Sequence, residues 1–142
     1  MAEIKPKHRH RARRLVLQGL YEWQISGNSI SDIETNLLIE NQHRVFDQEF
    51  LHQFLHGILT ETSELDAIFN EYLDRNLDEI TPVELAILRM GVYELKHRLD
   101  VPYKVVLNES VELCKIFGAS ESHKYINGIL DKAAQQLRKG EI

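Results

Sequence analysis

The sequence predicts an all-α fold of about seven helices in two small packed bundles. Apolar residues recur at intervals of three and four along almost the whole chain, which is the spacing of one face of a helix. No segment keeps the period of two that is typical of a strand. The pair Asn127-Gly128, which could form a hairpin turn, lies inside a helical pattern. Helices alone therefore account for the periodicity.

The length of 142 residues is that of one domain, and 43% apolar residues are enough for a core. We expect a single domain over residues 1–142 with a basic N-terminal arm at 1–8, and two bundles could meet near residues 76–81. No long apolar run predicts a membrane span, and no apolar stretch follows the basic N-terminus as in a secretory signal. A cytoplasmic location without membrane contact is expected.

A first helix is predicted from about residue 9 to residue 25. Small and apolar side chains at helical spacing form its core face: Ala12, Val16, Gly19, Leu20 and Trp23. The opposite face is basic and carries one aromatic ring: Arg11, Arg14, Gln18 and Tyr21. The turn-forming run Ser26-Gly27-Asn28 then ends the helix.

Three further helices are predicted before residue 75. Ser31 and Asp32 can cap a short second helix, which carries the apolar residues Ile33, Leu37 and Leu38. The third helix has six apolar residues on one stripe: Phe50, Leu51, Phe54, Leu55, Ile58 and Leu59. After a short turn at Thr62-Ser63 the pattern resumes in a fourth helix: Leu65, Ile68, Phe69, Tyr72 and Leu73.

The clearest local signal is the start of a fifth helix. Thr81 can accept a hydrogen bond from the backbone N–H of Glu84 while Glu84 reaches back to Thr81, which is a capping box. Pro82 presets the first turn, and Ile80 can pack against Leu85. The residues that follow are apolar on most sides, which indicates a central helix: Val83, Ala86, Ile87, Leu88, Met90, Val92, Tyr93 and Leu95.

Two more helices complete the pattern. Pro102 restarts the chain before a sixth helix, which ends at Gly118. This helix carries Val105, Val106, Glu109, Val111, Leu113, Ile116 and Phe117. Ser120 or Ser122 can cap a seventh helix. Its expected buried stripe is Ile126, Ile129, Leu130, Ala133, Ala134 and Leu137, with Lys124, Asn127, Asp131 and part of Tyr125 outside.

The sequence gives little support for a catalytic site or a metal site. The single cysteine, Cys114, has no nearby histidine or second cysteine and is interpreted as a helix-packing thiol. His52 and His56 are one helical turn apart, but no carboxylate or third histidine stands at a ligand spacing beside them, so they are interpreted as exposed helix histidines. Catalytic nucleophile, phosphate-loop and dinucleotide motifs are absent. We expect a non-enzymatic protein with no cofactor and no metal.

The charge is unevenly distributed. Residues 1–14 carry six Lys and Arg against one acid, a net +5, whereas the rest of the chain carries 11 basic and 21 acidic residues, a net −10. A basic arm on an acidic body is typical of proteins that bind polyanions, because clustered cations release counterions from phosphates. A solvated, disordered leader is the alternative.

Three features favour RNA as the polyanion, and we expect them to converge. They are the basic arm, the Arg11, Arg14 and Tyr21 face of the first helix, and the start of the seventh helix. A helix N-terminus offers N–H groups to phosphate, Lys124 adds charge, and Tyr125 offers a ring on which an unpaired base can stack. The alternative for Tyr125 is a half-buried packing residue.

Several motifs in order resemble the NusB family nearly end to end. They are Arg9-His10-Arg11-Ala12-Arg13-Arg14, Gln18-Gly19-Leu20-Tyr21-Glu22-Trp23-Gln24, Leu88-Arg89-Met90-Gly91-Val92-Tyr93-Glu94-Leu95, Asp100-Val101-Pro102-Tyr103-Lys104-Val105, Asn108-Glu109, Phe117-Gly118 and Lys124-Tyr125-Ile126-Asn127-Gly128-Ile129-Leu130-Asp131. The resemblance implies a seven-helix, two-bundle fold. It also implies transcription antitermination in ribosomal RNA synthesis, with single-stranded boxA RNA and the ribosomal protein NusE as partners, and RNA polymerase reached through other Nus factors.

The resemblance also implies roles for particular residues. The RNA contacts would be Arg9, His10, Arg11, Arg13, Tyr72, Phe117, Ser120, Glu121, Ser122 and Tyr125, to which the charge of Lys124 is added. The residues toward the protein partner would be Tyr21, Gln24 and Glu84. An acid at Glu121 would weaken phosphate binding, which suits an affinity that stays modest until the partner joins.

Two other functions fit a helical chain of this kind. NusB-like domains also precede the catalytic domain of ribosomal RNA cytosine methyltransferases, but that reading needs a Gly-rich cofactor loop, which this sequence does not contain. The second alternative is a structural homodimer that buries its apolar stripes between chains. Salt-dependent binding of boxA RNA, absent for a scrambled RNA, would distinguish an RNA-binding module from such a scaffold.

Overall fold

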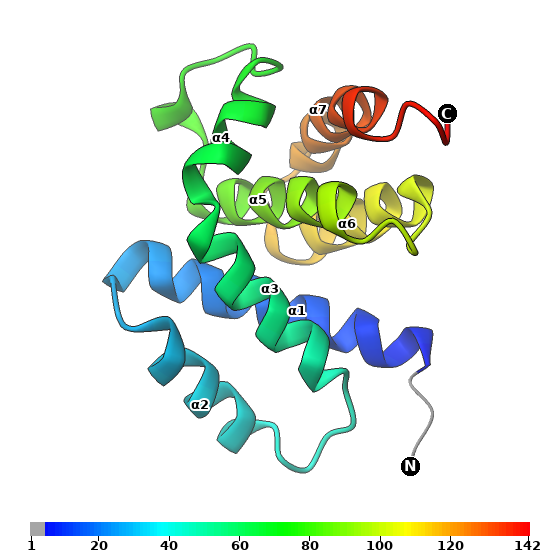
Figure 1. The fold of residues 1–142 in the computed structure, drawn as a ribbon. Helices are drawn as coiled ribbons and strands as arrows, with labels where there is room; N and C mark the ends of the chain where they lie inside the picture. The colour runs from blue at the N-terminus through cyan, green and yellow to red at the C-terminus, as the bar shows by residue number, and fades with distance from the viewer. Residues whose placement is uncertain (1–4) are drawn as a thin grey trace. The chain divides into compact units, whose positions relative to one another are not determined.

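The computed structural model describes residues 5–142 and is all-α over that range, as the periodicity predicts (Figure 1). Residues 1–4 of the expected basic arm lie outside the described residues. The helices are α1 (Pro6–Ser26), α2 (Ile30–Glu40), α3 (Gln48–Thr60), α4 (Thr62–Asn70), α5 (Pro82–His97), α6 (Tyr103–Phe117) and α7 (Ser122–Leu137), with a 3-10 turn η1 (Leu77–Glu79). None of the helices in this range is long and apolar enough to cross a membrane.

The chain forms two compact units that divide between Thr60 and Glu61. Two bundles were expected and are found, but the boundary expected near residues 76–81 is wrong. The reason lies in α4, which packs against α5 and α7 and so belongs to the second unit although it follows α3 after a single residue. The single-domain organisation expected from the length stays a prediction.

In the first unit, α1 packs against α2 and α3. The predicted faces of α1 are confirmed except at Trp23, which is only half-buried. The other core-face residues, Ala12, Val16, Gly19 and Leu20, are buried, whereas Arg11, Arg14, Gln18 and Tyr21 are exposed. The helix begins at Pro6, three residues earlier than expected, so the end of the basic arm is helical. It ends at Gly27, whose φ of 72° lies in the left-handed region that glycine adopts at low cost.

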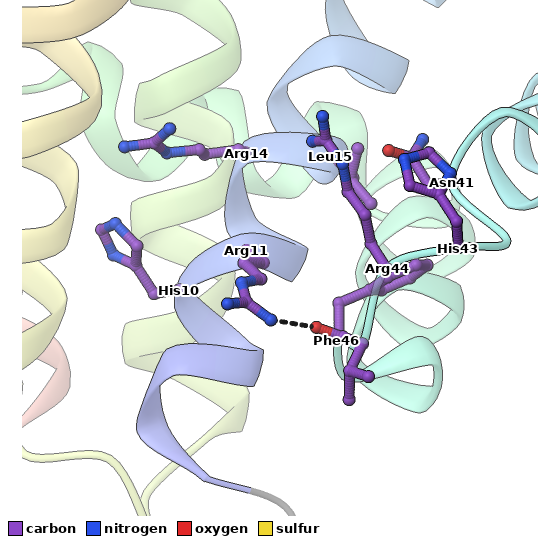
Figure 2. Close-up of a pocket in the computed structure, with 9 residues that line it drawn as sticks. His10, Arg11, Arg14, Leu15, Asn41, His43, Arg44 and Phe46 are labelled. Carbon is purple, nitrogen blue, oxygen red and sulfur yellow. Dashed lines mark hydrogen bonds between the residues drawn. The ribbon is translucent and has the colours of Figure 1, made fainter.

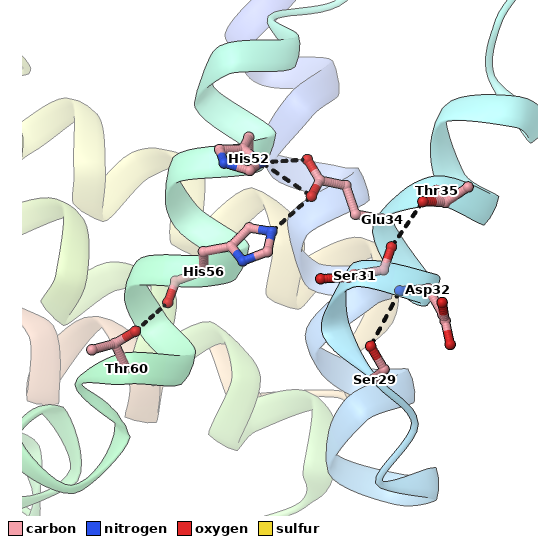
Figure 3. A network of polar contacts seen from close by, with 8 residues as sticks. All are labelled: Ser29, Ser31, Asp32, Glu34, Thr35, His52, His56 and Thr60. Atoms are coloured by element: carbon pink, nitrogen blue, oxygen red, sulfur yellow. Dashed lines mark hydrogen bonds and ion pairs between the residues drawn. The ribbon is translucent and has the colours of Figure 1, made fainter.

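The start of α2 corrects one expected cap and reveals an unexpected cluster. Ser29, not Ser31, is the N-cap, and its hydroxyl accepts a hydrogen bond of 3.4 Å from the backbone N–H of Asp32. The inference that no carboxylate stands beside His52 and His56 is also wrong. Packing of α2 against α3 brings Glu34 into hydrogen-bond distance of both rings (Figure 3).

In the second unit, α5 is the central helix and packs against α4, α6 and α7. Its capping box is confirmed: the Thr81 N–H donates to Glu84 Oε1 at 3.0 Å, and the Glu84 N–H donates to Thr81 Oγ1 at 3.1 Å. The helix is buried without interruption from Ala86 to Leu95. The pattern that is apolar on most sides therefore predicted its central place correctly.

The stripe expected on α6 needs correction. Val105, Ile116 and Phe117 are exposed, and the buried side is formed by Val106, Leu107, Ser110, Leu113 and Cys114. At about 100° per residue, Val105 and Ile116 lie away from this buried side around the helix axis, whereas Phe117 is aligned with it but is the last residue of the helix. The interpretation of Cys114 as a packing thiol agrees with its burial, which raises the pKa of the thiol to about 12, with a smaller contribution from the charge of Glu84.

The start of α7 is also built differently from either expected serine cap. The N-cap is Glu121, whose φ of 73° is left-handed and whose side chain makes no capping hydrogen bond. Ser122 is buried, and its hydroxyl donates to Glu84 Oε2 at 2.9 Å. Glu84 thus serves the cap of α5 with one carboxylate oxygen and holds the start of α7 with the other.

Two glycines make a matched pair for testing the packing of α5 on α7. A Cβ at Gly91 would lie 2.8 Å from both Leu130 methyl carbons, and Leu130 is fully buried. Overpacking of this kind costs about 1–3 kcal/mol, more than the helix propensity of Ala returns, so we expect Gly91→Ala to lower the free energy of unfolding. A Cβ at Gly128 meets nothing within 4 Å, so Gly128→Ala should raise that free energy by about 0.5–1 kcal/mol. Urea unfolding of both variants measures these changes, and an equal effect of the two would contradict the close approach.

Candidate nucleic-acid interface

The exposed face of α1 presents cations on the first unit. Arg11 and Arg14 are exposed, and Nη1 of Arg11 donates to the carbonyl oxygen of Val45 at 2.8 Å. This bond directs the guanidinium toward the connection between α2 and α3. A hydrogen bond to a carbonyl leaves the charge of Arg11 unneutralised, so it can still attract phosphate.

A groove of about 600 Å³ lies where α1 meets that connection (Figure 2). It is lined by His10, Arg11, Arg14, Leu15, Asn41, His43, Arg44, Val45 and Phe46. Among the residues that the structure describes, its lining includes three arginines and two histidines and no acid. Arg11 turns toward the loop that carries His43 and Arg44, whereas the side chains of His10 and Arg14 leave α1 on the side away from that loop (Figure 2). Such a set suits a phosphate-bearing chain, because arginine pairs with two phosphate oxygens at once.

Two of these lining residues, His43 and Arg44, were missed in the sequence. They lie between α2 and α3, about thirty positions after the basic arm, in a segment without helical periodicity. The signal that could have found them is a basic pair in an exposed loop. Its nearness to Arg11 and Arg14 depends on how α1, α2 and α3 pack.

Arg9 and Arg13, two of the expected RNA contacts, are engaged within the first unit. Arg13 is only 5% exposed, and its guanidinium carbon lies 5.1 Å from the centre of the Phe50 ring. The Nε of Arg9 lies 3.5 Å from Oδ2 of Asp47, the residue before α3. RNA contacts by Arg9 and Arg13 stay predictions, and the more exposed Arg11 and Arg14 are better placed for phosphate.

In the second unit, Tyr125 lies against a cation that the sequence did not point to. The guanidinium carbon of Arg75 is 3.8 Å from the centre of the half-buried Tyr125 ring. Arg75 also pairs with Asp74 at 3.1 Å, and this hydrogen bond raises the pKa of the Arg75 guanidinium and lowers the pKa of the Asp74 carboxyl. Burial, followed by the negative charge of Asp74, raises the pKa of the Tyr125 hydroxyl. The ring is therefore neutral and has a cation on it.

The other expected RNA contacts of this unit differ in how accessible they are. Phe117 is 47% exposed, and Ser120 and Glu121 are exposed as well. Lys124 is exposed but pairs with Glu121 at 2.7 Å, which partly cancels its charge. Ser122, in contrast, is buried, and the half-buried Tyr72 donates its hydroxyl hydrogen to Gln136 Oε1 at 2.6 Å.

The three residues expected to contact a protein partner also differ in how exposed they are. Tyr21 is 43% exposed on α1, and Gln24 is half-buried one turn later. Glu84 is buried, and both oxygens of its carboxylate accept hydrogen bonds from within the second unit. Partner contacts at all three stay predictions, of which Tyr21 is the most accessible.

Comparison with known proteins identifies the family. The model of the NusB family matches residues 10–135. The chain belongs to the NusB family. Proteins of Alcanivorax borkumensis and Pseudoalteromonas translucida, each called transcription antitermination protein NusB, are both 51% identical to it over 136 residues. These alignments cover 96% of this chain and 91% and 100% of the two relatives.

Solved structures of NusB proteins have the same fold. T. maritima NusB matches with a TM-score of 0.83 and 27% identity, over 94% of each chain. A structure of antitermination factors NusB and NusE in complex with double-stranded RNA matches with a TM-score of 0.82, over 93% of this chain and 99% of that chain. At 24% identity, this second likeness shows the fold alone. The NusB resemblance stated from the sequence motifs is confirmed.

Proposed function

We propose that the protein is a transcription antitermination factor that binds boxA single-stranded RNA together with NusE and so supports ribosomal RNA transcription. The observation that carries the proposal is the groove beside α1, whose lining within residues 5–142 includes three arginines and two histidines and no acid. Membership of the NusB family supports it, since the relatives at 51% identity are named for transcription antitermination.

The first unit would supply phosphate binding. Arg11 and Arg44 lie on the two sides of this groove and Arg14 extends from another side of α1, so an RNA backbone that follows this helix can meet several guanidinium groups. The chain as a whole has a formal charge of −5, which makes a cationic groove a local feature rather than a consequence of overall charge. Phosphate contacts of this kind fix the position of the RNA and carry little sequence information.

The second unit would supply base recognition. Tyr125 offers a neutral aromatic ring, Phe117 offers a second exposed one, and an unpaired base can stack on either. The Lys124 charge is partly balanced by Glu121, so this region attracts phosphate only weakly. We therefore expect the chain alone to bind RNA modestly, and its complex with the protein partner to bind RNA more tightly.

The proposed partner is NusE, with RNA polymerase reached through other Nus factors. A structure with this fold holds NusB and NusE on double-stranded RNA, which supports the pairing of a protein and an RNA partner. The exposed Tyr21, with Gln24 one turn later, would contact NusE. The acidic remainder of the chain, outside the basic N-terminal segment, suits a basic protein partner.

The double variant Arg11→Ala/Arg14→Ala tests phosphate binding. We expect it to weaken binding of boxA RNA and of a scrambled RNA alike. The slope of log K against the logarithm of the salt concentration should become shallower by about 1.4, because each lost phosphate contact on a single strand accounts for about 0.7. Fluorescence anisotropy at several salt concentrations, with and without NusE, measures both effects.

The control for this test is Lys132→Ala/Lys139→Ala, which removes the same charge at two exposed positions of the second unit. It should leave the salt slope close to that of the wild type. Equal slopes for the wild type and the Arg11→Ala/Arg14→Ala variant would reject the groove as the phosphate-binding site.

A further inference from the structure

A cluster of three potential metal ligands lies in the first unit, between α2 and α3 (Figure 3). The Nδ1 atom of His52 is 2.8 Å from Oε2 of Glu34, and the Nε2 atom of His56 is 2.7 Å from Oε1 of the same carboxylate. The donor atoms of the three residues all lie within 4.8 Å of one another. Two helices thus bring two imidazoles and one carboxylate together.

Two helices position the residues of this cluster. His52 and His56 are separated by one turn of α3, so both rings project from the same face, and the ring centres are 4.3 Å apart. Glu34 is mostly buried on α2, a helix that Ser29 caps at its N-terminus. Burial raises the pKa of Glu34, but the hydrogen bonds from His56 and His52 outweigh it, so that the pKa is lowered overall.

We propose that Glu34, His52 and His56 form a binding site for a divalent transition-metal ion of the Zn²⁺ class, which would join α2 to α3. Two imidazoles and a carboxylate are a donor set that Zn²⁺ accepts with one position left for water. Imidazole ligands disfavour Mg²⁺ and Ca²⁺, which prefer sites made of oxygen atoms.

The three donor groups would have to shift to admit the ion. Ligand bonds of about 2.0–2.1 Å in a tetrahedron place neighbouring donor atoms about 3.3 Å apart. The present N···O separations of 2.7 and 2.8 Å are hydrogen bonds, so the carboxylate would move back by about half an ångström. The donor atoms lie within 4.8 Å of one another, so the two ring nitrogens would also move to the tetrahedral separation. The side chain of His52 is 65% exposed, which leaves room for that movement and for the water ligand.

The metal-free cluster also shows how the ring nitrogens would change role. An ionised carboxylate can only accept hydrogen bonds, so the nitrogen that each ring turns toward Glu34 carries a hydrogen in the metal-free form. Transfer of that hydrogen to the other ring nitrogen through solvent would turn a lone pair toward the ion. Each imidazole changes tautomer and stays neutral, which is the form that binds metal.

The experiment is calorimetric titration of the full chain with ZnCl₂ at about pH 7.5, above the ordinary range of histidine titration. We expect saturable binding of one Zn²⁺ per chain, and no binding when MgCl₂ replaces ZnCl₂. Zn²⁺ at about 100 times its Kd should raise the Tm by about 9 °C. Co²⁺ bound in place of Zn²⁺ should give the visible absorption of a tetrahedral site.

Ligand variants decide whether this cluster is the site. His52→Ala and Glu34→Gln should each weaken Zn²⁺ binding by at least about tenfold, and His52 is exposed enough that its replacement leaves the core intact. The controls His10→Ala and His43→Ala remove other histidines of the same unit and should bind Zn²⁺ as the wild type does. Failure of the wild type to bind one Zn²⁺, or unchanged binding by His52→Ala, would overturn the proposal and leave a hydrogen-bonded triad only. None of these measurements uses RNA, so they are independent of the proposed function.

Discussion

Replacing Arg138 by Met is expected to lower the free energy of unfolding by about 3–5 kcal/mol, the largest effect on stability that we expect from one substitution. Arg138 is only 3% exposed, yet it carries a full charge after the end of α7. Its guanidinium donates to the carbonyl oxygens of Leu95 at 2.6 Å, Arg98 at 2.9 Å and Val101 at 3.0 Å. It also pairs with Oε1 of Glu141 at 2.6 Å.

The reason for so large an effect is the end of α5. The last four carbonyl groups of a helix have no partner within it, and they carry the negative end of the helix dipole. The planar fork of Arg138 satisfies carbonyls at this end and in the turn that follows, and it places a positive charge where the dipole favours one. Methionine fills a similar space but donates no hydrogen bond, so the buried carbonyl groups of Leu95 and Val101 lose their donor, whereas the Arg98 carbonyl keeps the hydrogen bond from the Val101 N–H.

Urea unfolding followed by circular dichroism measures the effect. Arg138→Lys should fall between the wild type and Arg138→Met, because an ammonium keeps the charge but cannot reach all of these carbonyls from one position. Lys139→Ala, at the exposed neighbouring position, is the matched control and should stay within about 0.5 kcal/mol of the wild type. A loss of less than about 1 kcal/mol for Arg138→Met would show that solvent replaces the guanidinium.

The sequence predicts well the features that depend on residues close together in the chain. The capping box of Thr81 and Glu84 needs only two residues three positions apart, and both of its hydrogen bonds form. The basic and apolar faces of α1 likewise follow from spacing alone. Helix identity and the buried faces of α1 and α5 could therefore be predicted directly, because hydrophobic periodicity is a local property.

The features that the sequence does not predict join residues far apart in the chain. Arg75 and Tyr125 are fifty positions apart, and Arg138 meets Leu95 across more than forty. Glu34 could not be assigned to His52 and His56 because a ligand spacing was sought along one helix, whereas the carboxylate comes from a neighbouring one. Such contacts depend on how the helices pack against one another, which no local sequence pattern predicts.

Local sequence patterns also failed to identify the N-cap residue where more than one neighbouring residue could cap the helix. A serine cap for α7 was expected at Ser120 or Ser122, but the chain turns at Glu121 with a left-handed backbone and buries Ser122 against Glu84. For α2, Ser31 and Asp32 were expected to cap the helix, but the cap is Ser29. Cap positions are decided by where packing begins the helix, so boundaries are less certain than helices.

Replacing Tyr125 by Ala is expected to weaken binding of boxA RNA in the presence of NusE by about 1–3 kcal/mol, roughly 5- to 150-fold, while binding of a scrambled RNA changes little. This is the largest functional effect that we expect from one substitution. An aromatic ring contributes that much when a base stacks on it. Arg75 already lies 3.8 Å from the ring centre, so the ring is held in one orientation before RNA arrives.

Tyr125→Phe separates stacking from simple packing. Phenylalanine keeps the ring and removes a hydroxyl that is buried, so it should bind boxA RNA within about twofold of the wild type if stacking is what matters. If Tyr125 is only a packing residue, Tyr125→Ala should lower the free energy of unfolding while the ratio of boxA to scrambled affinity stays constant. Because the two roles predict different changes in that ratio, anisotropy titration of both RNAs with both variants decides between them even if Tyr125→Ala is less stable.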